Sequence, residues 1–284
     1  MIWQFRNRKM DFERVRLVGI LNVTPDSFSD GGIFFSPQRA LERALEMEKE
    51  GADLIDIGGE STRPGAHPVS EEEELNRILS VIAEIRSLSP IPISIDTTKP
   101  SVAQKALEAG ADIVNDVDGL RASQEMAFVA KEFGAGFILM HRRGTPETMQ
   151  SLTDYDSVTE DVFRELNQSF EEVLQTGLSA DQIVLDPGIG FSKTTGQNLE
   201  ILNNLNHFLS WQRPILVGPS RKSFIGNLVS KEPSQRDWGT AAAVALSVAL
   251  GAHLVRVHNV SAMKDVVRVS ESIIHSRSDA HVRS

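Results

Sequence analysis

The repeated unit that decides the fold is clearest at residues 51–59, which read GADLIDIGG. A glycine and alanine pair is followed by a short apolar, β-branched run, and then by a polar side chain with glycines. The same glycine and alanine pair occurs again before short apolar runs at Gly110, Gly134 and Gly251. Glycine at this position is typical of a helix C-cap, and a fully apolar run is typical of a strand buried on both faces. The repeat therefore predicts related units in which a helix leads into a buried strand.

Eight apolar runs of strand length alternate with longer amphipathic stretches along the chain. Residues 40–50 and 75–85 have helical spacing, and Ser70 followed by four glutamates is typical of a helix start. Such alternation favours a single α/β domain, a (β/α)8 TIM barrel over residues 1–275, followed by a frayed polar tail at 276–284. The predicted strands are 17–21, 54–57, 91–95, 113–114, 137–140, 183–185, 215–217 and 254–257.

Composition limits the partners that the protein can have. The 284 residues include 40% hydrophobic and 24% charged residues, which is ordinary for a globular protein with a sizeable core. A net charge of -10 opposes general attraction to nucleic acid or to anionic lipid. We therefore expect any anion site to be local and built from a few placed cations.

Neither cysteine chemistry nor a membrane segment is expected. The chain has no cysteine, which excludes disulfides and thiolate metal sites and fits a reducing compartment. Residues 1–9 lack the apolar core of a signal peptide, and the longest apolar stretch, 241–250, is well short of the ~20 residues of a membrane span. These features favour a cytoplasmic protein.

Polar side chains follow all eight predicted strands. In a barrel of this kind the functional site lies at the C-terminal ends of the strands, so these residues are expected to share one rim. Solvated strand ends are the simpler explanation for any single one of them. The residues are Asn22, Asp56, Asp96, Asn115, Asp116, His141, Asp186, Ser220, Arg221, Lys222, Arg256 and His258, with Glu60, Thr62 and Arg63 just beyond the second strand.

Two kinds of site are expected at this rim. Arg63, Lys222, Arg256 and His258 gather cations in an acidic protein, near glycine-rich turns, and this combination favours an oxyanion such as phosphate. A second set, formed by Asp96, Asn115 and Asp186, suits the paired N–H groups of an amino-pyrimidinone ring. Three separately paired core residues remain an alternative for this second set.

Several of these positions carry a family resemblance. Residues 19–32 and 56–65 resemble the two long signatures of the dihydropteroate synthases, which are pterin-binding enzymes. Further matches lie at 95–100, 115–116, 185–191 and 220–226, so the resemblance extends through most of the barrel. It implies condensation of 6-hydroxymethyl-7,8-dihydropterin pyrophosphate with p-aminobenzoate, giving 7,8-dihydropteroate and pyrophosphate for folate synthesis. It also implies a homodimer and sensitivity to sulfonamides.

The resemblance assigns a role to each matching residue. The catalytic residues would be Arg63, Lys222 and His258. The pterin would be bound by Asp96, Asn115, Met140, Asp186, Phe191 and Lys222. Pyrophosphate would be bound by Asn22, Thr62, Arg63, Arg256 and His258. The p-aminobenzoate pocket would be formed by Phe28, Pro64, Phe191 and Ser220. The cofactor Mg²⁺ would be bound by Asn22, with Asp30 as a second ligand.

The expected mechanism is dissociative. The bond from the pterin methylene to pyrophosphate would break first, and the arylamine would then capture the pterin methyl cation. This route needs no side-chain nucleophile, in keeping with the lack of cysteine. Placed charges would carry the catalysis.

Four residues depart from the usual family pattern: Asp118, Arg142, Arg143 and Asn259. None of them replaces an assigned ligand. Asn259 stands where the family often has aspartate, beside His258, and is expected to loosen the hold on pyrophosphate.

Three other functions were weighed. A pterin-binding methyltransferase barrel would need Asp96, Asn115 and Asp186 but no pyrophosphate pocket, and Arg63 with residues 220–222 argues against it. A non-catalytic pterin-binding paralogue is disfavoured by the intact loops at 22–32 and 61–65. A sugar-phosphate barrel enzyme lacks a credible general base paired with a phosphate loop.

Overall fold

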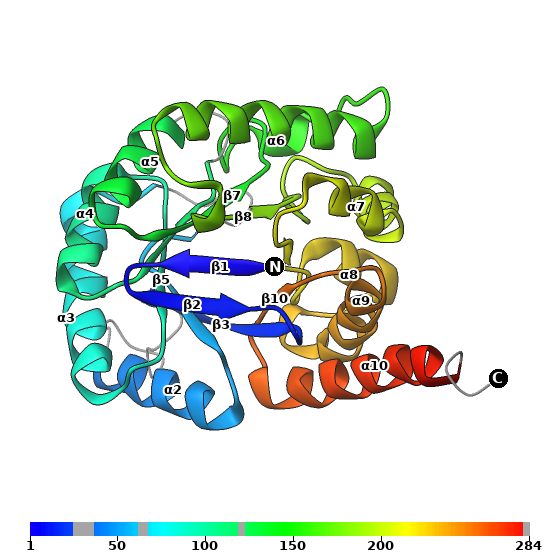
Figure 1. Cartoon of the computed structure of the whole chain (residues 1–284), viewed down its shortest axis with the longest axis horizontal. Helices are drawn as coiled ribbons and strands as arrows, with labels where there is room; N and C mark the ends of the chain where they lie inside the picture. Colours follow the sequence, from blue (N-terminus) through cyan, green and yellow to red (C-terminus); the bar gives the residue numbers. More distant parts are fainter. Residues whose placement is uncertain (25–36, 62–67, 119–122, 281–284) are drawn as a thin grey trace.

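Eight parallel strands form a nearly closed barrel with helices around it in the computed structural model (Figure 1). The structure describes residues 1–24, 37–61, 68–118 and 123–280. This arrangement confirms the predicted TIM barrel. The barrel strands are β3 (Arg16–Asn22), β4 (Leu54–Gly58), β5 (Ile93–Thr97), β6 (Ile113–Asp116), β7 (Gly136–Met140), β8 (Ile183–Asp186), β9 (Leu216–Val217) and β10 (Leu254–Val257).

The barrel closes between β8 and β9. The strands follow the order β8-β7-β6-β5-β4-β3-β10-β9, and Leu185 forms a parallel bridge with Ile215. The amide of Leu185 also donates to the carbonyl of Pro214 at 3.0 Å. Several strand boundaries differ from the prediction by one or two residues. The largest shift at a strand start is in β5, which begins at Ile93 and not at residue 91. Pro92 has no amide hydrogen for a sheet, and only its carbonyl bonds to the neighbouring strand.

Helices cover the outside of the barrel, as the alternating pattern predicted (Figure 1). The last of them continues through residues 276–280, which we expected to be frayed. The helices are α2 (Pro37–Glu50), α3 (Glu71–Leu88), α4 (Pro100–Ala109), α5 (Ser123–Glu132), α6 (Val158–Gln175), α7 (Thr195–Asn203), α8 (Ser223–Val229), α9 (Asp237–Ala249) and α10 (Val260–Ala280). Short 3-10 helices are η1 (Met149–Ser151), η2 (Ala180–Gln182), η3 (Leu205–Trp211) and η4 (Pro233–Gln235).

The repeated glycine and alanine pairs end helices, as predicted. Gly51, Gly110 and Gly251 have φ angles of 108°, 119° and 100°, in the left-handed region that favours glycine. In each pair the alanine amide donates to a carbonyl near the end of the helix, such as Ala52 to Met47 at 2.9 Å. The pairs therefore turn the chain from each helix into the next strand.

A hairpin that we did not predict covers the N-terminal end of the barrel. Strands β1 (Ile2–Phe5) and β2 (Arg8–Asp11) pair antiparallel and lie across this end in Figure 1. Trp3 and Phe5 are buried against the barrel interior, and the indole Nε1 of Trp3 donates to the carbonyl of Gln182 at 2.7 Å. The hairpin closes this end, which leaves the opposite end, where the strands finish, for ligands.

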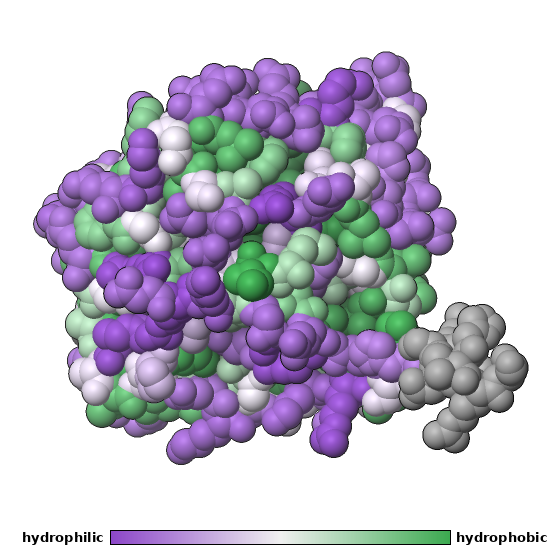
Figure 2. All heavy atoms as spheres, viewed as in Figure 1, coloured by the Kyte–Doolittle hydropathy of each residue, from purple (hydrophilic) through white to green (hydrophobic). Residues whose placement is uncertain are grey.

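Glycine at position 136 makes room for this hairpin. A β-carbon there would lie 3.0 Å from side-chain atoms of both Trp3 and Phe5. Figure 2 shows that the face seen in Figure 1 is largely hydrophilic, with small apolar patches. Across the described ranges, none of the helices has the length and apolar character needed to cross a membrane.

We predict that Trp3→Ala destabilises the protein by about 3–5 kcal/mol, because it leaves a cavity under the hairpin and an unpaired carbonyl at Gln182. Denaturant unfolding measures the change. Phe128→Ala is the matched control, because the Phe128 side chain is exposed on α5 and should cost less than about 1 kcal/mol. Equal losses in the two variants would contradict a packing role for the hairpin.

Candidate functional site

A partly buried arginine joins two carboxylates at the C-terminal end of the barrel. Arg256 on β10 donates from Nε to Asp56 Oδ2 at 2.6 Å and from a terminal nitrogen to Asp96 Oδ2 at 2.7 Å. Asn115 on β6 donates from Nδ2 to the same oxygen of Asp56 at 3.1 Å. Side chains from β4, β5, β6 and β10 therefore meet at one point, as a barrel requires of its strand ends.

Asp96 carries an unsatisfied oxygen. Its Oδ1 atom is buried and accepts no hydrogen bond from any described residue. Burial raises the pKa of Asp96 to about 7, because desolvation disfavours the carboxylate more than the charge of Arg256 favours it. A buried acceptor without a donor is costly, so this position is suited to a ligand that brings N–H groups.

Asp186 lies at the end of β8. Burial raises the pKa of its carboxyl group, although Lys222 and the amide of Gly188 favour the charged form. The Gly188 amide donates to Asp186 Oδ1 at 2.7 Å. Met140, at the end of β7, is the register partner of Asp186 and is buried, so an apolar wall stands beside this carboxylate.

Lys222 follows β9 and reaches across the site. Its Nζ donates to the carbonyl of Ile189 and lies 4.0 Å from the centre of the Phe191 ring. Burial lowers the pKa of Lys222 to about 7, and the charge of Asp186 opposes this shift. A partly buried cation beside a carboxylate and an aromatic ring fits a flat, polar heterocycle.

The residues after β9 and β10 are linked through a serine. The His258 amide donates to Ser220 Oγ at 3.2 Å, and Ser220 Oγ lies 2.9 Å from His258 Nδ1. Because the serine oxygen already accepts from the amide, its hydroxyl hydrogen is available to His258 Nδ1. In the neutral ring the proton then resides on Nε2, the nitrogen suited to donate to an anion.

Gly58 separates two further rim residues. A β-carbon at Gly58 would lie 3.8 Å from Asn22 Oδ1 and 3.8 Å from Asp96 Oδ2. The Asn22 amide oxygen is therefore close to the carboxylates. Within the described ranges, no group of three or more histidine, aspartate or glutamate side chains is placed to hold a metal ion.

The loop after β8 requires glycine at two positions. Gly188 has a φ of 71°, and a β-carbon there would lie 1.9 Å from the carbonyl oxygen of His141. Gly190 has a φ of 86°, and its β-carbon would lie 2.4 Å from the Lys222 side chain. The loop therefore fits tightly between β7 and Lys222.

The structure brings most of the predicted residues to one rim, and others fall outside its described part. The sequence places Asp56 at a strand end without a predicted role. In the structure Asp56 is the second carboxylate that Arg256 contacts. The assembled residues are Asn22, Asp96, Asn115, Met140, Asp186, Phe191, Ser220, Lys222, Arg256 and His258. Outside the described residues lie Phe28, Asp30, Thr62, Arg63 and Pro64.

The four departures from the usual pattern have partners. Arg142 forms an ion pair with Asp118, so these two changes accompany each other. Arg143 donates from Nε to Glu165 at 2.9 Å. Asn259 donates to Asp237 at 3.0 Å. An aspartate at position 259 would face the carboxylate of Asp237, so asparagine avoids a repulsion between like charges.

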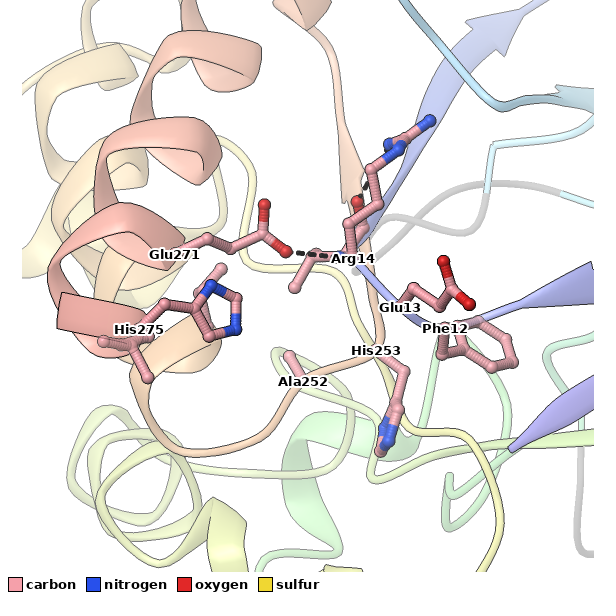
Figure 3. Close-up of a pocket in the computed structure, with 10 residues that line it drawn as sticks. Phe12, Glu13, Arg14, Ala252, His253, Glu271 and His275 are labelled. Atoms are coloured by element: carbon pink, nitrogen blue, oxygen red, sulfur yellow. Dashed lines mark hydrogen bonds between the residues drawn. The ribbon is translucent and has the colours of Figure 1, made fainter. Parts of the chain in front are cut away.

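The described residues line two cavities in different parts of the barrel. One, of about 260 Å³, adjoins Asp96 and is lined by Glu60, Lys99, Asp118 and Arg142 among others. The second, of about 150 Å³, lies near the N-terminal ends of β3 and β10 (Figure 3). Glu271 and His275 project towards it from α10, and Phe12 and His253 line the other side. This second cavity is away from the polar strand ends.

Known proteins are similar to this chain over most of its length. Residues 18–258 match the family model described as pterin binding enzyme. The dihydropteroate synthase of Synechocystis is 47% identical over 262 residues, covering 92% of this chain and 91% of that protein.

Solved structures are also similar. The dihydropteroate synthase of Clostridium difficile, determined in the presence of pteroic acid, has a TM-score of 0.86 and 43% identity, covering 92% of this chain and 97% of that one. The enzyme of Xanthomonas albilineans, determined with 4-aminobenzoic acid, has a TM-score of 0.89 and 39% identity, covering 96% and 97%.

The raised pKa of Asp96 predicts a pH-dependent stability. Between about pH 4 and 7 the folded protein holds a proton on Asp96 that the unfolded chain releases, so this group's contribution to stability falls as pH rises through that window. Asp96→Asn should therefore gain stability relative to the wild type between about pH 5 and 8, by roughly 1 kcal/mol or more. Urea unfolding of both proteins at about pH 5 and about pH 8 measures this gain. If the two proteins differ equally in stability at both pH values, the raised pKa of Asp96 is contradicted.

Proposed function

The chain belongs to the pterin-binding enzyme family, and we propose from this that its barrel end carries out dihydropteroate synthase chemistry. The enzyme is a transferase that joins 6-hydroxymethyl-7,8-dihydropterin pyrophosphate to p-aminobenzoate, and it releases pyrophosphate in folate synthesis. The observation that carries the proposal is the convergence of Asp96, Asp186 and Lys222 with Arg256 and His258 on one rim. The proposed domain comprises residues 1–275.

The pterin binds among the buried polar groups. The open oxygen of Asp96 accepts from the amino-pyrimidinone edge, and this contact supplies the donors that the carboxylate lacks. Asp186 and Asn115 provide further polar contacts to the ring. The ring also needs contacts to its faces and to its edge. An aromatic ring at Phe191 and an apolar wall at Met140 suit the faces, and the cation of Lys222 suits the polar edge.

Pyrophosphate binds on the His258 side of the rim. Ser220 orients His258 so that Nε2 can donate to a phosphate oxygen. Arg256 and Asn22 complete the described part of this site, and Thr62 and Arg63 add contacts from the second loop. Arg256 donates from two nitrogens to Asp56 and Asp96, so it links the carboxylates to the phosphate side of the rim.

Mg²⁺ suits the residues present. The Asn22 amide oxygen lies at the rim near Asp96, and Mg²⁺ takes oxygen ligands sparsely from proteins when phosphate oxygens and waters complete its coordination. Asn22, with Asp30 as a second ligand, would hold the ion. When bound, Mg²⁺ supplies positive charge that stabilises the leaving diphosphate.

The p-aminobenzoate pocket forms beside Phe191 and Ser220, with Phe28 and Pro64 contributed by the first two loops. The Xanthomonas albilineans enzyme, which is 39% identical to this chain, was determined with 4-aminobenzoic acid, which supports p-aminobenzoate as a ligand here. A dihydropteroate synthase from Yersinia pestis was determined with a sulfonamide drug, which supports sulfonamide binding at the same pocket here.

The reaction is dissociative. The carbon–oxygen bond to the diphosphate breaks with both electrons going to oxygen, and the carboxylates of Asp96 and Asp186 stabilise the pterin cation that forms. Lys222 holds the ring in place, while Arg63 and His258 stabilise the departing charge. The nitrogen of p-aminobenzoate then attacks the methylene carbon and loses a proton.

The two pterin-binding alternatives are less well supported. A methyltransferase-like barrel has no use for the Ser220 and His258 pair that faces the phosphate side. A non-catalytic paralogue would need the pterin-binding carboxylates but would be free to lose the Ser220 and His258 pair, which this chain keeps.

A homodimer forms through the late outer helices. Leu246 on α9 and Val269 and Ile273 on α10 are exposed apolar side chains, and Trp238 at the start of α9 is 84% exposed. Such side chains at one side of the barrel fit a subunit interface. Light scattering should give about twice the 31.3 kDa chain mass, and a monomer mass would contradict the dimer. We place the protein in the cytoplasm.

We predict that the purified protein releases one pyrophosphate for each 7,8-dihydropteroate formed, and only when both substrates are present. A coupled pyrophosphate assay with and without p-aminobenzoate measures this.

Arg63→Ala should lower kcat/KM by on the order of a hundredfold or more while the unfolding midpoint is unchanged. Absence of pyrophosphate release by the wild type would refute the function, and loss of folding in the variant would remove Arg63 from the catalytic set.

A further inference from the structure

A buried lysine lies behind the loop that carries Phe191. Lys193 is only 3% exposed, and its Nζ lies 3.0 Å from each of three acceptors. Two of these are the carbonyl oxygens of Gly188 and Phe191, and the third is Nδ1 of His141. An ammonium group has three N–H donors, so all of them are used.

His141 is built to accept this bond. The ring is fully buried, and burial lowers the pKa of His141 to about 4, so that the ring is neutral. Its Nε2 lies 3.1 Å from Glu165 and donates to that carboxylate, which leaves Nδ1 as the acceptor for Lys193. Although burial opposes ionisation, bonds from Arg143 and His141 hold the pKa of Glu165 at about 2. The chain from Glu165 to Lys193 is therefore fully paired.

Lys193 holds both ends of a short loop. Gly188 and Phe191 begin and end the turn, and the Phe191 amide also donates to the Gly188 carbonyl at 3.2 Å. Between them lies Ile189, whose carbonyl accepts from Lys222. Phe191 supplies the ring beside Lys222 Nζ. Both of these contacts to the catalytic lysine come from the segment that Lys193 fixes.

A purely structural role explains this lysine poorly. Burial lowers the pKa of Lys193 to about 7, which means that the charged form is disfavoured by its surroundings. Apolar residues of similar volume often replace buried charges without loss of stability. Asn198 already fastens the outer side of the loop, since its Oδ1 accepts from the Gly190 amide at 2.6 Å. The additional donors of Lys193 fix the inner carbonyls.

We propose that Lys193 is a positioning residue that holds residues 188–191 so that Ile189 and Phe191 set the place of Lys222 for the pterin. Lys193 touches no substrate in this arrangement and acts through the loop. The proposal rests on the proposed function, because it assigns the pterin to the site of Lys222. It adds the cluster of Lys193, His141 and Glu165 to the machinery of pterin recognition.

The test compares Lys193→Met with Lys131→Met. Methionine keeps the length of the side chain and removes the three donors. Lys131 is the control, because its Nζ also donates to a backbone carbonyl, that of Thr176 at 2.8 Å, at the C-terminal end of α6 and away from the loop. Calorimetry with 6-hydroxymethylpterin gives the pterin affinity, steady-state kinetics give KM for the pterin pyrophosphate and kcat, and thermal unfolding reports the fold.

We expect Lys193→Met to lose at least fivefold in pterin affinity, with a matching rise in KM, while Lys131→Met retains the wild-type affinity. A loss below fivefold in Lys193→Met, or an equal loss in the control, would overturn the proposal. If Lys193→Met does not fold, Lys193→Leu, which also removes the donors, is judged by the same threshold. Failure of the wild type to bind the pterin would refute the proposed function instead.

Discussion

The pairing of Arg256 with Asp56 and Asp96 is the interaction on which the arrangement of the site depends. Two buried carboxylates from neighbouring strands would repel one another, because little water is present to screen their charges. The guanidinium group can bond to both because it presents its N–H groups in a fixed fork. In the barrel β10 lies beside β3, two strands from β4 and three from β5, so Arg256 links strands that are not direct neighbours.

The charged and polar groups of the site are not fully paired in the protein alone. One oxygen of Asp96 is left without a donor, and Lys222 is held as a cation in surroundings that disfavour it. In the proposed function, both groups would gain partners when a heterocycle with N–H donors and polar acceptors enters. Part of the unfavourable electrostatic energy of the folded site would then be recovered on binding.

The sequence predicted the barrel because its signal is periodic and local. Glycine and alanine pairs mark the helix ends, and apolar runs mark strands with buried faces, so both are visible without tertiary information. The polar strand ends followed from the geometry of a barrel. The hairpin at residues 2–11 was missed because its alternation is short and is broken by Arg6 and Asn7 at the turn.

Contacts across the barrel could not be predicted in the same way. Spacing placed Asp56, Asp96 and Arg256 at strand ends, but which carboxylate meets the arginine depends on strand order and register. Lys193 gave no signal at all, since a lysine after a glycine-rich loop is usually solvated. Its role is visible only because His141, distant in sequence, supplies the third acceptor.

The hairpin also constrains how the chain reaches its final form during synthesis. Trp3 bonds to Gln182, a separation of 179 residues, so the earliest strands cannot dock until β8 has left the ribosome. At typical elongation rates that interval is roughly 10–40 s. Throughout this time Trp3 lacks its final hydrogen-bond acceptor, and the hairpin cannot complete its packing against Val184 on β8.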